Sequence, residues 1–146
     1  MQIREALPGD AGAIEGLYRS FVANPAIDVR GDRIEEIRSD PRNFLLVVEE
    51  AGRLVGTAFV TLCLDPMFAF RPYAVVENIV VSEGERRKGI GRGLLEHIDD
   101  IATREGCTKI MLLSSSHRTE AHAFFARVGF DPEKKRGFVK YLTRRS

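Results

Sequence analysis

Hydrophobic and polar positions follow two different periods along this chain. Apolar residues recur every three or four positions over residues 10–22, 89–105 and 116–128, which is the period of an amphipathic helix. Residues 32–38 predict a further, shorter helix. Runs rich in Val, Leu, Ile, Phe and Thr are typical of strands, and they occupy residues 1–6, 44–50, 53–63, 73–82, 108–113 and 137–143. The order β-α-α-β-β-β-α-β-α-β indicates an α/β fold built on one mixed sheet.

Turn and cap residues separate these elements. Asp10 follows Pro8 and Gly9, where it is expected to cap the first helix, and Ser116 is expected to cap the last one. Gly106 lies where the C-terminal cap of the long helix belongs. Residues 50–53 predict a hairpin turn, and residues 64–72, with two prolines, predict a loop that carries apolar side chains.

Length and composition restrict the class of protein. The chain has 146 residues, 44% hydrophobic and 29% charged, which excludes disordered and fibrous classes and predicts one domain over residues 1–146. A chain of this size buries about 68–70% of its surface without needing a disulfide or a metal. The net charge of +1 gives no reason to expect nucleic acid as a partner.

The sequence also indicates the cellular compartment. The uncharged apolar runs are shorter than the roughly 20 residues of a membrane helix, so no membrane partner is expected. Residues 1–10 show no basic-then-apolar leader, which predicts a cytoplasmic protein. Cys63 and Cys107 lack metal-ligand spacing and suit a reducing compartment.

The most informative segment joins the strand at 73–82 to the long helix. Arg86, Arg87 and Lys88 precede Gly89, Gly91 and Gly93 at the helix start. Free backbone N–H groups and the positive end of the helix dipole together favour an anion there, and glycine permits close approach. The alternative is a solvated basic turn whose glycines only pack the helix on the sheet. The spacing fits neither a nucleotide P-loop nor a dinucleotide-binding fingerprint.

Four segments together are similar to the GNAT family of N-acetyltransferases. Residues 86–91, Arg-Arg-Lys-Gly-Ile-Gly, resemble its acetyl-CoA loop, and residues 121–130 resemble its late Ala-x-x-Phe-Tyr-x-x-x-Gly-Phe helix. The opening residues 3–10 look like the usual family start. Residues 106–110 resemble a subset that includes amino-sugar-phosphate acetyltransferases. The resemblance implies a single-domain GNAT-like acyl-CoA N-acyltransferase fold, with a central, mostly antiparallel sheet and flanking helices.

The resemblance also implies an activity and a cofactor site. The acetyl group of acetyl-CoA would pass directly to a primary amine of a small molecule or peptide, although the sequence does not identify that acceptor. The resemblance implies that the backbone of residues 79–81 meets the pantetheine arm, where this strand splays from the next parallel strand at residues 108–113. Backbone N–H groups of residues 87–92 would hold the pyrophosphate. The residues concerned are Ile79, Val80, Val81, Arg86, Arg87, Lys88, Gly89, Ile90, Gly91 and Arg92. Homodimers are common among similar proteins, but no interface is evident here.

Two positions depart from the family pattern and affect the expected chemistry. Phe125 replaces the tyrosine proposed to protonate the leaving thiolate, and Arg118 replaces a common asparagine. Phe125 is expected to pack with its ring bordering the thioester, and His117 is a candidate cofactor contact and proton donor. These departures keep open a non-catalytic acyl-CoA-binding module. Glu77, a charged residue in an apolar strand, is the candidate general base; the alternative is that it faces solvent or pairs with an arginine.

Overall fold

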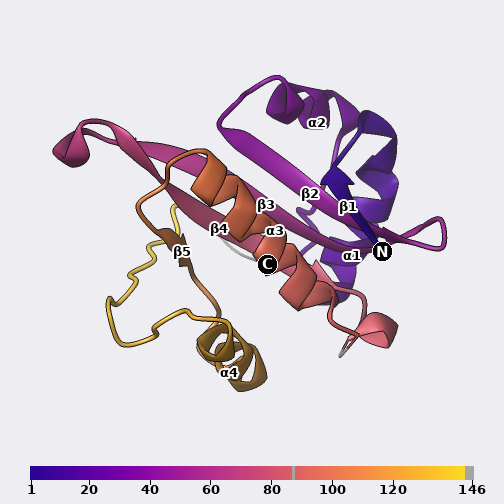
Figure 1. Cartoon of the computed structure of the whole chain (residues 1–146). Coiled ribbons are helices and arrows are strands. Elements are labelled where there is room, and N and C mark those ends of the chain that lie inside the picture. The colour runs from indigo at the N-terminus through magenta and orange to yellow at the C-terminus, as the bar shows by residue number, and fades with distance from the viewer. Residues whose placement is uncertain (87, 144–146) are drawn as a thin grey trace.

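The computed structural model describes residues 1–86 and 88–143, and five strands in it form one sheet in chain order. The strands are β1 (Gln2–Glu5), β2 (Asn43–Glu50), β3 (Arg53–Asp65), β4 (Arg71–Val81) and β5 (Ile110–Leu112). The first four are antiparallel, whereas β5 lies parallel to β4 (Figure 1). The mixed sheet predicted from the sequence is therefore confirmed.

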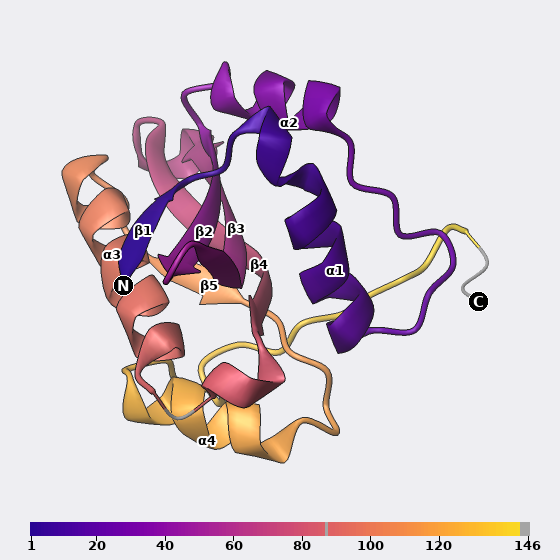
Figure 2. The same ribbon diagram turned by 90° about the vertical axis from the view of Figure 1, so that its right-hand side faces the viewer.

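Helices cover both faces of the sheet (Figure 2). The helices α1 (Ala11–Phe21) and α2 (Gly31–Arg38) lie on one face, and α3 (Ile90–Arg104) lies on the other. The fourth helix, α4 (Thr119–Arg127), packs beside the start of α3. None of the described helices combines the length and the apolar character that a membrane span requires.

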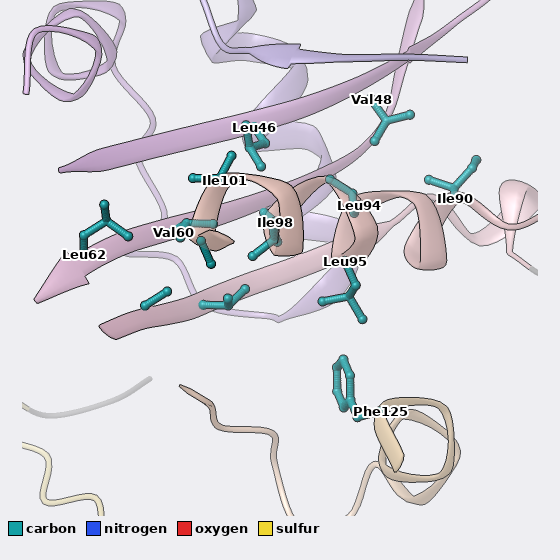
Figure 3. Close-up of a cluster of buried hydrophobic side chains, with 14 of the residues drawn as sticks. Leu46, Val48, Val60, Leu62, Ile90, Leu94, Leu95, Ile98, Ile101 and Phe125 are labelled. Carbon is teal, nitrogen blue, oxygen red and sulfur yellow. The ribbon is translucent and has the colours of Figure 1, made fainter. Parts of the chain in front are cut away.

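Two apolar clusters hold these layers together. The larger one lies between the sheet and α3, where Leu94, Ile98 and Ile101 meet side chains from β2, β3 and β4 (Figure 3). The smaller one joins Ile14 of α1 and Ile34 of α2 to the opposite face. Each helix has the apolar stripe that its sequence period predicts, and burial of these stripes fixes the sheet between the helices.

Two predicted details near turns need correction. Asp10 immediately precedes α1, but its carboxylate accepts hydrogen bonds from the Leu7 N–H at 2.7 Å and from Arg4 Nη1 at 2.8 Å, and caps no helical N–H. The predicted loop at 64–72 is shorter, because the strands extend to Asp65 and restart at Arg71. Asp65 closes that tip by accepting from the Met67 N–H at 2.9 Å.

The predicted ends of the last helix and the last strand are wrong. α4 begins after Arg118, which makes no side-chain cap, so Ser116 does not cap it. Residues 137–143 form no strand in the described part of the chain, and Phe138 and Leu142 are 88% and 89% exposed. A strand needs an edge to pair with, and β5 supplies a strand of only three residues. A run of strand-forming residues is therefore not sufficient for pairing.

Candidate active site

The central feature of the site is an open strand edge. β4 pairs with β5 through three residue pairs and the last of these joins Val76 to Leu112. On its other side β4 stays paired with β3 as far as Val81, which opposes Gly56. Residues 77–81 therefore have no neighbouring strand on the β5 side among the described residues. Backbone amides along such an edge are available to hydrogen-bond an extended ligand.

A bulge lies where this open edge begins. Thr57 opposes Val80 and Phe59 opposes Glu77, so Asn78 and Ile79 together face a single residue of β3. Asn78 has a φ of 54°, a left-handed conformation that asparagine tolerates better than most residues. The sequence prediction missed this bulge, although an asparagine inside an apolar strand was a signal for it. The bulge bends β4 at the point where it parts from β5.

Glu77, the predicted base, is exposed at this bulge. It makes no hydrogen bond or ion pair with a described residue, so the arginine partner considered as an alternative is not found there. Beyond the bulge, Val80 is buried, and Ile79 and Val81 pack on the core under α3. These three side chains are occupied by packing, which leaves their backbone groups for a ligand.

The start of α3 has the properties of an anion site. Gly89 precedes the helix with a φ of 80°, a conformation that favours glycine, and a side chain there would meet no atom within 4 Å. The first N–H groups of a helix lack intrahelical partners, and the first turn contains no acidic residue. The space, the donors and the charge all fit a pyrophosphate.

Gly91 has a different role from Gly89. A side chain there would come within 3.4 Å of the Phe124 ring, so this glycine lets α4 pack against the start of α3. Ile90 between them is buried in the core, and only its backbone is available to a ligand. The sequence raised packing of the helix on the sheet as the alternative, whereas the nearest neighbour at Gly91 is the Phe124 ring of α4.

The cations of the loop are not equally available. Lys88 Nζ lies 3.1 Å from Glu85, which is also paired with Arg53, so its charge is partly neutralised. Arg86 Nε donates only to the Val81 carbonyl oxygen, at 3.4 Å. The Arg92 guanidinium is exposed, 3.9 Å from Glu96. Arg87, also predicted as a cofactor contact, lies outside the described residues.

Arg118, a departure from the family pattern that the sequence places with His117 at a helix start near the cofactor, is a further candidate site residue. Its guanidinium lies 4.7 Å from the centre of the Phe21 ring at the end of α1. Burial lowers its pKa, and the nearby charge of Arg86 lowers it further. No carboxylate of a described residue pairs with Arg118. Two arginines close together without an acid form an environment that favours an anion.

The remaining predicted residues lie on α4 and the turn before it. Phe125 is 9% exposed, and its ring packs against Phe124 and Phe130 at centroid distances of 5.6 and 6.1 Å. It points into the core beneath α3 in Figure 3. His117 is exposed, whereas His122 Nε2 lies 2.9 Å from the Ser115 carbonyl oxygen. Of the two histidines, His117 has the imidazole that is accessible to a ligand.

Known proteins with similar sequences and folds agree on one family. The model of the acetyltransferase (GNAT) family matches residues 13–130. Streptothricin acetyltransferase from Streptomyces lavendulae is 31% identical, over 88% of this chain and 80% of its own length. A putative acetyltransferase from Agrobacterium tumefaciens has 31% identity and a TM-score of 0.83, covering 97% of this chain and 100% of its own.

A third comparison shares the fold at lower identity. The structure of AAC(6')-Iy in complex with the bisubstrate analog CoA-S-monomethyl-acetylneamine has 19% identity and a TM-score of 0.80, with 97% and 98% of the two chains covered. At that identity the likeness concerns the fold alone. Because the family model matches residues 13–130 and a relative at 31% identity covers 88% of the sequence, this chain belongs to the acetyltransferase (GNAT) family.

Proposed function

We propose that this protein transfers the acetyl group of acetyl-CoA directly to a primary amine of a small molecule or peptide. The observation that carries the proposal is the open edge of β4 leading to the start of α3, where Gly89 leaves space for an anion. An extended ligand with amides at one end and phosphates at the other matches this arrangement. Streptothricin acetyltransferase, a relative at 31% identity, supports a small-molecule acceptor.

The residues that would hold acetyl-CoA follow from this geometry. Backbone groups of Ile79, Val80 and Val81 would bond the pantetheine amides, because no described strand pairs with that edge. N–H groups from Gly89 to Arg92 would hold the pyrophosphate, with Arg86 adding charge. Bound acetyl-CoA supplies the acetyl thioester, which is the electrophile for the amine.

The chain's own groups would manage the protons. Glu77, exposed at the bulge, takes the proton that the acceptor nitrogen loses as the new C–N bond forms. When the C–S bond breaks, the electron pair stays on sulfur, and water or His117 returns a proton to it. A thiol has an unperturbed pKa of about 8.5, so this leaving group is tolerable near neutral pH without a tyrosine.

Phe125 favours one alternative. Its buried ring has no proton to donate, so a protein that binds acyl-CoA without turnover is the second candidate. The two candidates share the cofactor site and differ only in chemistry. An experiment must therefore separate binding from turnover.

The deciding experiment measures acetyl-CoA binding by calorimetry, and CoA thiol release with a panel of acceptors. The panel includes an aminoglycoside, an amino sugar with and without phosphate, a polyamine, an amino acid and a peptide. We expect the protein to bind acetyl-CoA, and we expect amine-dependent release of the CoA thiol with at least one acceptor. Binding without release on any amine would favour the non-catalytic module. Absence of binding would overturn both candidates.

A further inference from the structure

Ser114 lies where β4 and β5 separate. The last pair of the parallel register joins Val76 to Leu112, and Ser114 is two residues beyond Leu112. Two residues beyond Val76 is Asn78, the bulged residue with positive φ. Ser114 and Asn78 are thus equally far along the chain from the last residue pair, beyond which the edge of β4 is open.

The Ser114 hydroxyl is enclosed and unpaired. Its oxygen is buried from solvent and has no hydrogen-bond partner among the described residues. Most buried polar side-chain atoms in native proteins do have a partner, so an unpaired hydroxyl calls for a specific explanation. An unsatisfied buried group costs free energy, and a ligand group that reaches it recovers that cost on binding.

The neighbouring residues show that this enclosure is specific. Ser115 and Ser116 follow directly in the chain and are both exposed, so water satisfies their hydroxyls. The Ser115 carbonyl oxygen already accepts from the Arg118 N–H at 3.0 Å and lies near His122. Of these three serines, Ser114 is the one whose hydroxyl is buried without a partner, and it is the nearest of the three to the end of β5.

We propose that Ser114 is a binding residue for the acyl donor, and that its hydroxyl donates a hydrogen bond to a carbonyl oxygen of the acyl-pantetheine arm. The inference rests on the proposed function, since it requires acetyl-CoA in the gap beside β4. A carbonyl suits this place because it is a neutral acceptor, and a neutral group enters an enclosed site more readily than a charged one. Ser114 would thus anchor the thioester end, as Gly89 admits the phosphate end.

The test compares two ligands and two matched variants by calorimetry. Acetyl-CoA carries the arm, whereas adenosine 3',5'-diphosphate carries phosphates and no arm. Ser114→Ala should bind acetyl-CoA about two- to tenfold more weakly than wild type, as expected for one lost hydrogen bond. It should bind adenosine 3',5'-diphosphate equally well. Ser116→Ala, the exposed control, should match wild type with both ligands.

Thermal unfolding without ligand provides a second measurement. Because Ser114→Ala removes an unsatisfied buried group, the ligand-free variant should melt at the same temperature as wild type or higher. Equal acetyl-CoA affinity in Ser114→Ala and wild type would overturn the inference and leave the proposed function intact. Equal losses for both ligands would also overturn it, since they would show general damage to the site. If wild type fails to bind acetyl-CoA, the proposed function fails and the inference fails with it.

Discussion

The segments that follow β4 and β5 are built in opposite ways. After β4, the loop folds on itself: Glu85 pairs with Lys88 and Arg53, the Gly93 N–H donates to the Gly89 carbonyl at 2.9 Å, and Ile90 anchors the helix in the core. After β5, Leu113 is 56% exposed and the next hydroxyl is buried without a partner. Ion pairs and a backbone hydrogen bond thus hold the first segment, whereas the second contains one buried hydroxyl without a partner among the described residues.

This difference has a consequence for ligand binding. The proposed phosphate end is shaped by interactions within the protein, so on our proposal it is preorganised and its ordering cost is already met. The proposed thioester end is bounded by β5, which stops pairing at Leu112, and by the turn in which Arg118 contacts Phe21. We therefore expect substitutions after β4 to change affinity for the phosphates, and substitutions near the bulge to change turnover.

The largest expected effect is at Glu77, which lies between the two segments. Glu77→Gln should lower the rate of acetyl transfer by about 10²–10⁴-fold, the usual contribution of a general base. The loss should be greatest at the lower pH values, where more of the acceptor amine is protonated. Steady-state rates across pH, with acetyl-CoA affinity measured in parallel, test this. An unchanged rate at every pH would make Glu77 a solvent-facing residue only.

Substitutions at two phenylalanines after β5, one buried and one exposed, compare how much each contributes to stability. Phe125→Ala should lower the free energy of unfolding by about 3–5 kcal/mol, because it empties a ring-sized space in the core. Phe138→Ala, at an 88% exposed position, should change it by no more than about 0.5 kcal/mol. Urea unfolding measures both. Equal losses would mean that residues 137–143 are packed in solution and that the contrast drawn above is wrong.

The fold was predictable where the information is local. The period of Leu94, Ile98 and Ile101 predicts α3 within one or two residues, and the β2–β3 hairpin follows from its turn. Residues 137–143 are also rich in strand-forming residues but form no strand in the described part of the chain. A strand depends on a partner edge far away in sequence, and the sequence does not encode the length of β5 in any local pattern.

The candidate site likewise contains features that local sequence predicts and features that depend on distant contacts. Gly89 was predictable because a glycine at a strand-to-helix turn has a local backbone reason. The contact of the Arg118 guanidinium with Phe21, which lies at the end of α1 nearly a hundred residues earlier, was not predictable. The unpaired hydroxyl of Ser114 depends on everything that surrounds it. Contacts between distant elements are what the sequence pattern could not supply.

A smaller effect is expected at Gly89, and Gly84 in the same loop provides the control. Gly89→Ala should cost about 1–2 kcal/mol of stability, because alanine is strained at a φ of 80°. Gly84 has no positive φ and open space around it, so Gly84→Ala should change stability by less than about 0.5 kcal/mol. Thermal unfolding compares the two variants.

A charged variant at Gly89 tests the phosphate site directly. Gly89→Asp places a negative charge where the pyrophosphate is proposed to bind, so saturating CoA should no longer raise its melting temperature. Wild type and Gly84→Ala should both gain stability with CoA. If CoA raises the melting temperature of Gly89→Asp as much as that of wild type, the start of α3 is not the phosphate site. The preorganisation of the first segment would then have no effect on CoA binding.

The smallest effect concerns the contact that ties the second segment to α1. A double-mutant cycle of Arg118→Gln and Phe21→Leu should give a coupling energy of about 0.5–1 kcal/mol, as expected for a guanidinium over an aromatic ring near the surface. Arg127→Gln combined with Phe21→Leu is the matched control cycle. It should give no coupling energy, because the Arg127 guanidinium is exposed and lies 6.0 Å from the Phe124 ring rather than over Phe21. Arg118→Gln should also weaken CoA binding, because it removes one of the two arginine charges, whereas Phe21→Leu should do so less. A coupling energy of zero, together with unchanged CoA affinity in Arg118→Gln, would contradict both roles. Arg118 would then neither hold the turn after β5 nor contribute to the anion site, and only a bound ligand would remain to order the second segment.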